Sequence, residues 1–458
     1  MTISRRKLLQ ITAAVGVISS LGFLAGRYIE GRKNRIFILY GQSNATGATD
    51  YSQTWRKPAP WGVYENGYEG EKDGDRFITK NGYGAITLSD DESEVSDINL
   101  FAYGVNGGEG QTFGIISQVK KLFPSDNIFI YGHGRGSLCV DQLIKPDIDL
   151  ILNGDDYNQP LGKDSLDYMI VSCERDYLSF KKPRFKYVYL NGMWILSKIK
   201  EILKSDVVVS GVFWLQGEND YANTDGYSDK LLKLRHQYVS DVMSITGQSS
   251  EPDFVIEESN YHGGNTVLDD CNINAHFKLN VEQSIAHAKA MQQDIALYIS
   301  GPRYPLTNEI HMYPHAQRAH GEKMAQALIS SIISGKSWSP LTYLSHKNED
   351  DSVLIKFSVP KSPLQFRKPL NGMYEFSKDG CPKGFHFTGK SLTEDDVRII
   401  GDDTVSINTS GKSGIISYVK EVRIGDLCDS DDFPNHFSDR YKDDNCMLNY
   451  CLPFEIEV

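Results

Sequence analysis

Two side chains in this sequence have the type and setting needed for nucleophilic chemistry: the hydroxyl of Ser43 and the imidazole of His311. Ser43 follows the apolar run 36–40 and Gly41. A buried strand that ends abruptly at a glycine puts the next residues in a sharp turn at the edge of a sheet. A serine hydroxyl attacks a carbonyl effectively only when a base removes its proton. The sequence therefore predicts a serine nucleophile with a histidine base, if the fold brings the two together.

A second group of polar side chains follows another expected strand, at residues 207–213. The next segment, residues 214–220 (WLQGEND), carries one amide and two carboxylates where that strand ends. The carboxyl ends of parallel strands meet at one edge of a sheet. Gln216, Glu218 and Asp220 are therefore expected to face the same crevice as Ser43. His311 reaches that edge from a segment just before a helix expected to start around residue 314.

The elements that must position these side chains alternate between strands and helices over residues 34–335. This alternation predicts an α/β unit with a doubly wound, flavodoxin-like parallel sheet that helices cover on both faces. The expected strands lie at 35–40, 127–131, 207–214, 253–256 and 295–299. The expected helices lie at 113–122, 187–203, 229–245, 281–292 and 315–333.

Residues 336–458 show a different pattern, with short alternating runs between Gly, Asp and Asn turns. The runs lie at 352–359, 384–387, 397–400, 404–407 and 414–419. Such runs predict a small antiparallel, sandwich-like β-domain. A chain of 458 residues is too long for a single hydrophobic core, which agrees with two folded units.

The first 30 residues have the features of an export signal rather than of a folded unit. Arg5, Arg6 and Lys7 precede the apolar segment 11–25, a twin-arginine-like arrangement. That segment is short for a membrane-spanning helix, but no clean cleavage site follows it, so a membrane tether stays an alternative. In both cases we expect the rest of the chain to be exported, to the periplasm or beyond the cell.

Composition excludes some partners and ligands. The chain has 48 basic and 60 acidic residues, a net charge of −12, and no long basic run beyond its amino terminus, so nucleic acid is not an expected partner. Of seven cysteines, those at 381, 428, 446 and 451 are the best candidates for disulfides. His315 follows His311 by four residues, but Pro314 lies between them and no third ligand has zinc-like spacing. We expect neither a metal nor a cofactor.

The polar segments together resemble the sequence blocks of the SGNH/GDSL-type hydrolases, in the branch of sialate O-acetylesterases and acetyl-xylan esterases (carbohydrate esterase family 6). Residues 41–44 (GQSN) match the nucleophile block, and residues 214–220 fit the Trp-x-Gln-Gly-Glu-x-Asp block. His311 with Gly321 fits the last block. Residues 132–138 (GHGRGSL) resemble the glycine-rich second block, where the family usually has Gly-Gly-Thr-Ser. The resemblance covers residues 36–330.

This resemblance implies a role for each candidate residue. Ser43 would attack an acetyl ester, and His311 would take its proton and later protonate the departing sugar alkoxide. The oxyanion would be held by the backbone N–H groups of Ser43 and Gly134 and by the side-chain amide of Gln216. The remaining polar residues of the two blocks would orient the loops of the site: Gln42, Asn44, Glu218 and Asp220.

The chain departs from the family pattern at Asn308, where an aspartate usually stands three residues before the histidine. An asparagine can orient the imidazole of His311, but it supplies no charge to stabilise the imidazolium. Three alternatives stay open. Asn308 orients the ring, Glu309 does so, or a carboxylate from elsewhere does so, such as Asp269 or Asp270.

The expected function is an exported serine esterase that removes O-acetyl groups from a carbohydrate. A glycan-binding protein on a weakened esterase scaffold is the alternative that Asn308 motivates, and a glycan transacetylase is a third. Aromatic residues within 50–105 either stack on sugar rings or fill small cores. The pattern of residues does not choose between sialic acid, xylan, pectin and bacterial polysaccharides as substrate, nor does it indicate an oligomeric state.

Overall fold

The structure is a computed structural model of the 458-residue chain. It describes residues 33–46, 83–85, 111–123, 126–134, 138–147, 188–203, 207–221, 223–259, 270–293, 297–300, 311–312, 314–334, 338–367, 379–422, 425–431 and 448–458. The export segment 1–30 and most of the aromatic segment 50–105 lie outside this set, and so do Asn308, Glu309 and Asp269.

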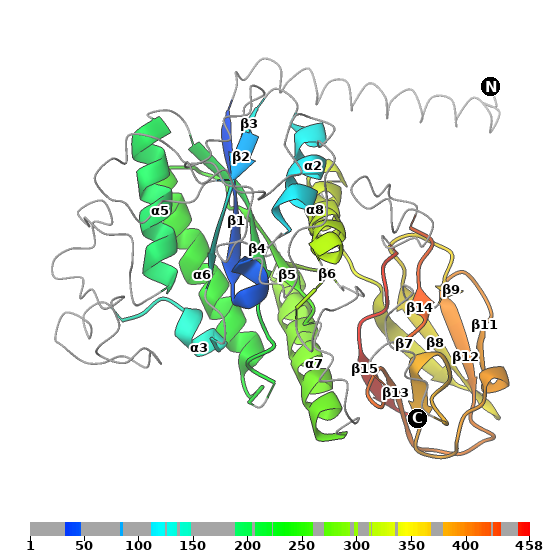
Figure 1. Ribbon diagram of the computed structural model, residues 1–458. Coiled ribbons are helices and arrows are strands. Elements are labelled where there is room, and N and C mark those ends of the chain that lie inside the picture. The colour runs from blue at the N-terminus through cyan, green and yellow to red at the C-terminus, as the bar shows by residue number, and fades with distance from the viewer. Residues whose placement is uncertain are drawn as a thin grey trace, which may run out of the picture.

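A six-stranded parallel sheet forms the centre of the larger unit (Figure 1). Its strands lie side by side in the order β2-β3-β1-β4-β5-β6, and every neighbouring pair is parallel. Their bounds are β1 (Asn34–Gly41), β2 (Tyr83–Ala85), β3 (Asn127–Gly134), β4 (Val207–Leu215), β5 (Asp253–Glu257) and β6 (Leu297–Ser300). The order β3-β1-β4-β5-β6 is the flavodoxin-like winding, so the predicted fold class is confirmed.

Helices cover both faces of this sheet. One face carries α2 (Thr112–Leu122) and α8 (Pro314–Ser334), which lie side by side (Figure 1). The other carries α5 (Val188–Leu203), α6 (Tyr227–Thr246) and α7 (Asp270–Gln292), with the short α3 (Val140–Leu143) nearby. The side chains of strand β1 alternate between the two covered faces. Ile36 and Ile38 join the core beneath α5 and α6, whereas Phe37 and Leu39 join the core beneath α2 and α8. A strand buried on both faces is apolar at every position, as this one is.

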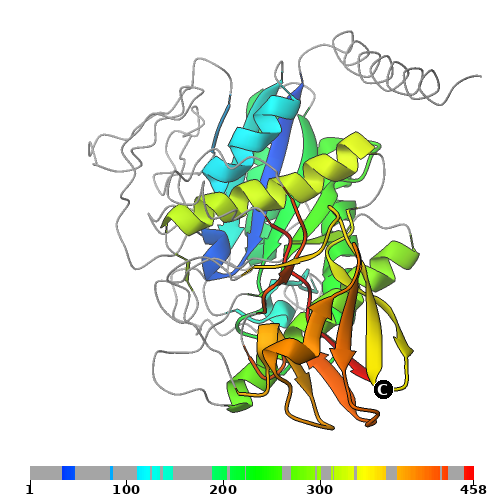
Figure 2. The ribbon, with the colours of Figure 1, turned by 90° about the vertical axis from the view of Figure 1, so that its right-hand side faces the viewer.

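The second unit consists of antiparallel sheets, seen from its own side in Figure 2. One sheet has the order β11-β12-β8-β7, another has β10-β13-β15, and β9 pairs with β14. The strands are β7 (Thr342–Asn348), β8 (Ser352–Ser358), β9 (Gln365–Phe366), β10 (Phe385–Phe387), β11 (Val397–Ile399), β12 (Thr404–Asn408), β13 (Ile415–Tyr418), β14 (Leu427–Cys428) and β15 (Phe454–Glu457). Short 3-10 helices lie at Pro382–Gly384 and Glu394–Asp396. Ile355 of β8 and Tyr418 of β13 belong to one apolar core that both larger sheets build. We call this unit the β-domain.

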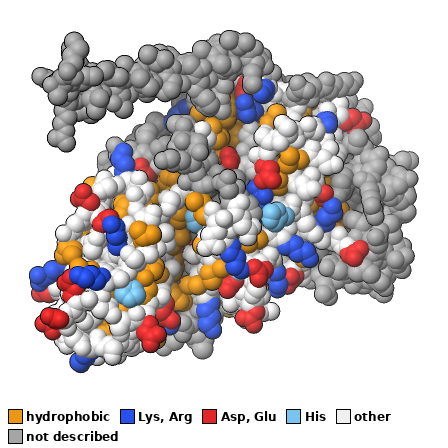
Figure 3. All heavy atoms as spheres, turned by 180° about the vertical axis from the view of Figure 1, so that it is seen from behind, with side chains coloured by type: hydrophobic (Ala, Val, Ile, Leu, Met, Phe, Trp, Pro, Cys, Tyr) orange, Lys and Arg blue, Asp and Glu red, His pale blue; other side chains and the backbone are white. Residues whose placement is uncertain are grey.

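No disulfide joins any two of the cysteines whose side chains the structure describes, which are Cys139, Cys381, Cys428 and Cys451, and Cys446 lies outside the described residues. On the face shown in Figure 3, acidic and basic side chains are interspersed rather than separated by sign. Within the described part of the chain, no helix is long and apolar enough to cross a membrane.

Candidate active site

The candidate residues meet where the winding of the sheet reverses. β1 lies between β3 and β4, and Gly41 at its end pairs with Gly134 on one side and Leu215 on the other. In open α/β sheets, ligands bind outside the carboxyl ends of the strands at such a reversal point. The register therefore brings Ser43, Gly134 and Gln216 to one edge of the sheet, although about 170 residues separate the first from the last along the chain.

The turn that carries Ser43 depends on the glycine before it. Gly41 has φ +150°, and a Cβ atom placed there would lie 2.0 Å from the carbonyl oxygen of Leu215. The N–H of Gln42 donates to that same oxygen at 3.0 Å, so the chain leaves the sheet while still bonded to β4. A 3-10 turn, Ser43–Thr46, follows at once. Ser43 is half-buried at its first position.

One carboxylate holds both residues that flank Ser43. Glu218 Oε2 accepts a hydrogen bond from Gln42 Nε2 at 2.5 Å, and Glu218 Oε1 accepts one from Asn44 Nδ2 at 2.8 Å. Both bonds are buried, so water does not compete for them. Burial raises the pKa of Glu218 to about 7, although the bonds from Asn44 and Gln42 act in the opposite direction. Glu218 therefore fixes the turn of Ser43 against the end of β4.

Gln216 and Asp220 join the segment after β4 to the segment after β3. Gln216 Nε2 donates to the carbonyl oxygen of Leu138 at 3.1 Å and to Asp220 Oδ2. Asp220 Oδ2 also accepts the N–H of Val140 at 2.9 Å, and burial raises the pKa of Asp220 to about 6. Tyr227 OH donates to Gln216 Oε1 at 2.9 Å. Both amide hydrogens of Gln216 thus have protein acceptors, and one of them must turn toward a substrate for Gln216 to bind an oxyanion.

The histidine next to Gly134 belongs to the core. His133 is buried, and its Nε2 and Nδ1 atoms lie 2.6 Å from Tyr238 OH and 3.2 Å from the Val188 carbonyl oxygen. Its ring stacks on that of Tyr40, with 4.2 Å between the ring centroids. Burial lowers the pKa of His133 to about 3. The ring is therefore neutral at ordinary pH and serves packing rather than acid–base chemistry.

His311 lies in the connection between β6 and α8, three residues before the helix begins, and it is half-buried. Because β6 runs parallel to β1, this connection starts at the same carboxyl edge that carries Ser43. Of the residues suggested to orient His311, Asn308, Glu309 and Asp269 lie outside the described residues. Asp270 begins α7, and its side chain is likewise not described.

A pair of buried acids that was not expected from the sequence lies at the end of the neighbouring strand. Glu257 ends β5 and Glu258 follows it. Both are buried, and Asn280 Nδ2 donates to Glu258 Oε1 at 3.3 Å. Glu257 Oε1 lies 3.8 Å from His320 Nδ1 on α8. Burial, with the charges of Glu218 and Glu258, raises the pKa of Glu257 well above its usual range, and burial lowers the pKa of His320 to about 3. Both shifts favour the uncharged forms. Two acids directly after an expected strand were the sequence signal for this pair.

No group of three or more His, Cys, Asp and Glu residues that could hold a metal ion occurs among the residues that the structure describes. The polar groups of the edge are instead bonded to one another, as the Glu218 and Asp220 contacts show.

Comparison with known proteins agrees with this architecture. The sequence matches no family model and no curated protein. The structure is similar to a carbohydrate acetylesterase from Xanthomonas citri, with a TM-score of 0.53 and 13% identity over 92% of this chain and 80% of that one. It is more distantly similar to NanS, with a TM-score of 0.38 and 10% identity over 66% of this chain and 98% of that one. The expected α/β architecture is therefore confirmed at the level of the fold, which this chain shares with a carbohydrate acetylesterase.

Proposed function

We propose that this protein is a serine esterase that removes O-acetyl groups from a carbohydrate through an acetyl-Ser43 intermediate. The observation that carries the proposal is the strand register, which brings the turn of Ser43, the end of β3 at Gly134 and the segment of Gln216 together at the reversal point of the sheet. The fold shared with a carbohydrate acetylesterase supports the choice of substrate class. Export through residues 1–30 stays a prediction.

The reaction assigns one step to each group. Ser43 Oγ attacks the acetyl carbonyl carbon while His311 takes the hydroxyl proton. The N–H groups of Ser43 and Gly134, with the amide of Gln216, stabilise the oxyanion. His311 then gives the proton to the sugar oxygen as the ester bond breaks. Water next attacks the acetyl-Ser43 ester while His311 takes its proton, and His311 returns that proton to Ser43 Oγ as the ester bond breaks and acetate leaves.

The contacts of Glu218 account for the geometry of this nucleophile. With Gln42 and Asn44 both bonded to one buried carboxylate, Ser43 between them has little freedom to move. Preorganisation of this kind lowers the entropy cost of reaching the reactive geometry. Gln42, Asn44, Glu218 and Asp220 are therefore positioning residues in this proposal, and Ser43 and His311 carry the chemistry.

Acetate release tests the proposal directly. The protein is incubated with 4-nitrophenyl acetate and with a panel of acetylated glycans, and the initial burst and turnover are measured. We expect Ser43→Ala to abolish the burst and His311→Ala to lower kcat by about 1,000-fold or more. Ser345→Ala, at an exposed serine of β7, is the matched control and should behave as wild type. Unchanged turnover in Ser43→Ala would contradict the mechanism.

Two observations favour a second function, glycan binding without efficient catalysis. Asn308 replaces the expected aspartate, and the amide hydrogens of Gln216 are already bonded within the protein. Calorimetric titration with oligosaccharides distinguishes the two functions: binding without acetate release supports the glycan-binding protein. Acetylated acceptor sugars among the products would instead indicate transacetylation.

A further inference from the structure

Helix α8 links His311 to the rest of the molecule, because it begins at Pro314, three residues after His311. Alongside apolar side chains such as Leu328, this helix buries a set of polar ones: Gln317, His320, Glu322, Lys323 and Gln326. A helix that covers a sheet ordinarily buries an apolar stripe and exposes its polar residues. The groups that contact this buried polar set therefore determine where α8 lies.

Helix α2 holds α8 from one side. Gln118 Nε2 on α2 donates to Glu322 Oε2 on α8 at 3.1 Å. At Gly321 the two elements come so close that an added Cβ atom would lie 2.0 Å from the carbonyl oxygen of Gln111. These contacts fix the distance of α8 from α2 but leave its far side to another partner.

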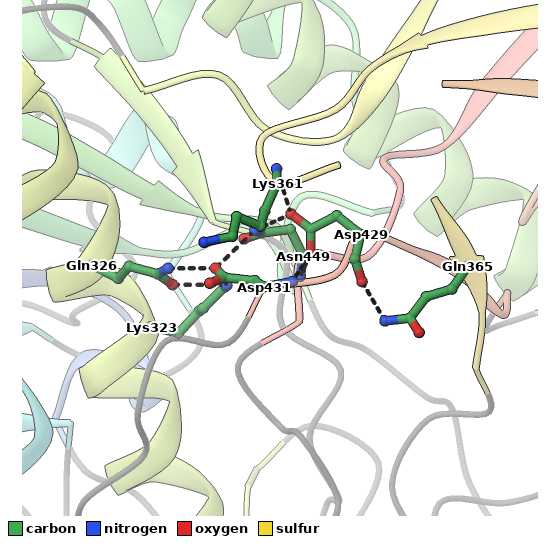
Figure 4. A network of polar contacts seen from close by, with 7 residues as sticks. All are labelled: Lys323, Gln326, Lys361, Gln365, Asp429, Asp431 and Asn449. Carbon is green, nitrogen blue, oxygen red and sulfur yellow. Dashed lines mark hydrogen bonds and ion pairs between the residues drawn. The ribbon is translucent and has the colours of Figure 1, made fainter. Parts of the chain in front are cut away.

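The β-domain supplies that partner (Figure 4). Lys323 Nζ lies 3.5 Å from Asp431 Oδ2, and Gln326 Nε2 donates to the same carboxylate. Lys323 Nζ also donates to Gln326 Oε1 at 2.9 Å, so the two α8 side chains reach Asp431 as one unit. The side chains of Lys323 and Asp431 are only 3% and 8% exposed. The contact is therefore a buried ion pair between the two units of the chain.

Asp431 is held in place from within the β-domain. Asn449 Nδ2 donates to Asp431 Oδ2 at 3.1 Å and to Asp429 Oδ2 at 2.6 Å. Asp429 Oδ1 accepts the backbone N–H groups of Asp431 and Asn449 at 3.2 and 2.9 Å. Asp429 Oδ2 accepts the backbone N–H of Lys361 at 3.1 Å (Figure 4). The acceptor that faces α8 is thus held by contacts within its own domain.

A buried ion pair is a poor means of simply joining two domains. The cost of removing both charges from water often equals or exceeds their attraction, and well-packed apolar residues of the same size hold surfaces together as well or better. The polar arrangement has one advantage, because its hydrogen bonds have direction and are lost when the helix slides or turns. The contact is therefore better suited to setting the position of α8 than to adding stability.

We propose that the β-domain positions the catalytic histidine through α8, with Lys323 and Asp431 as positioning residues. The inference rests on the proposed function, since it concerns the work of His311 in ester cleavage. When α8 shifts, the imidazole of His311 shifts with it, and misplacement on the scale of an ångström is enough to slow a reaction strongly. Ser43 lies on a different element, the turn after β1.

Two esters with different leaving groups separate this effect from a general loss of folded protein. 4-Nitrophenolate leaves without needing a proton, whereas a sugar alkoxide must receive one from His311. A misplaced His311 therefore slows deacetylation of a sugar more than hydrolysis of 4-nitrophenyl acetate. A lower fraction of folded enzyme reduces both rates by the same factor.

The test is the double variant Lys323→Met, Asp431→Leu, which removes the ion pair and keeps apolar volume at both positions. We expect kcat/KM on an acetylated sugar, which reports the step in which the sugar leaves, to fall by roughly ten-fold or more. It should fall by at least three-fold more than kcat/KM on 4-nitrophenyl acetate, with a similar melting temperature. Asp431→Asn, which keeps the shape of the side chain, serves as a second variant if the double variant does not fold. It should change the ratio of the two rates in the same direction.

The matched control is Lys420→Met, in the β-domain but directed at α7, where Lys420 Nζ lies 5.7 Å from the ring centroid of Phe277 and pairs with Glu455. Its rate ratio should equal that of wild type. Equal loss on both esters, or no loss, in the folded Lys323 and Asp431 variants would overturn the positioning role. A wild-type protein inactive on both esters would overturn the proposed function itself, and the two failures are thus distinguishable.

Discussion

At the scale of single residues, the most informative group is the carboxyl of Glu218. The turn of Ser43 is bonded to its charged form, although burial disfavours a charge at this position. The Glu218 carboxylate accepts one amide hydrogen from each neighbour of Ser43, and its burial raises its pKa to about 7. A protonated carboxyl would place a hydrogen against an amide donor. The site is therefore best organised above neutral pH, where Glu218 is charged.

Ionisation of Glu218 should consequently raise the activity and lower the stability of the protein as the pH increases. The folded-state pKa, about 7, lies above the reference value of 4.5, so its contribution to stability is full below pH 4.5 and is lost as pH rises through 7. That loss is about 3 kcal/mol. We expect kcat/KM to rise as the pH rises through 7, because only the charged carboxylate of Glu218 accepts both hydrogen bonds, from Gln42 and from Asn44.

The variant Glu218→Gln separates these trends. It cannot ionise, so the part of the pH dependence of unfolding that Glu218 causes should disappear, as measured by urea unfolding at pH 5 and pH 8. Its amide presents hydrogens to Gln42 or Asn44, and kcat should fall by roughly ten-fold or more at every pH. Glu349→Gln, at an exposed position, is the control. A variant that unfolds with the pH dependence of wild type would refute this account.

At the scale of elements, the site depends on how tightly β1 and its turn approach β4. The polar segments that follow β1 and β4 were visible in the sequence because a strand that ends in polar residues and glycine is a local pattern. The start of helix α7 was less visible, because its first turns carry polar residues such as Asn272 and Asn274. The helix begins at Asp270, whereas the sequence pattern predicted a start near residue 281. Local patterns thus predicted which elements exist better than where they begin.

Gly41→Ala tests the close approach of these elements. The new Cβ would lie 2.0 Å from the Leu215 carbonyl oxygen, and φ +150° is unfavourable for alanine. We expect the free energy of unfolding to fall by more than about 1 kcal/mol and the esterase rate to fall further, because the turn of Ser43 must move. Gly401→Ala, where no atom lies within 4 Å of the added Cβ, is the control. Equal behaviour of the two variants in unfolding and turnover would contradict the argument.

At the scale of the whole molecule, the β-domain shares core and polar contacts with the larger unit. Leu452, just before β15, is buried in the same apolar cluster as Ile36 and Trp214 of the parallel sheet. Its N–H donates to the carbonyl oxygen of Leu341 at 2.9 Å. With the Lys323 and Asp431 contact, this gives the two units two independent connections, one apolar and one polar.

The apolar connection predicts that the two units unfold together. Leu452→Ala should lower the free energy of unfolding by roughly 2 to 5 kcal/mol, because it leaves a cavity in the core that the units share. Leu344→Ala, at a leucine that is 58% exposed, should change it by less than about 0.5 kcal/mol. Calorimetry and urea unfolding measure both. Two separate transitions in wild type would contradict joint unfolding.

The sequence by itself determined the class of fold and the segments from which the site is built. Hydrophobic period, glycines and polar residues after strands are local features, and parallel strands must bring their carboxyl ends to one edge. Only the tertiary structure decided which groups bond there. Glu218 meets Gln42 and Asn44 across more than 170 residues, and Gln216 donates to the carbonyl oxygen of Leu138. Away from this edge, Lys323 pairs with Asp431. Partners so far apart in the chain depend on strand register and helix packing, which no local pattern encodes.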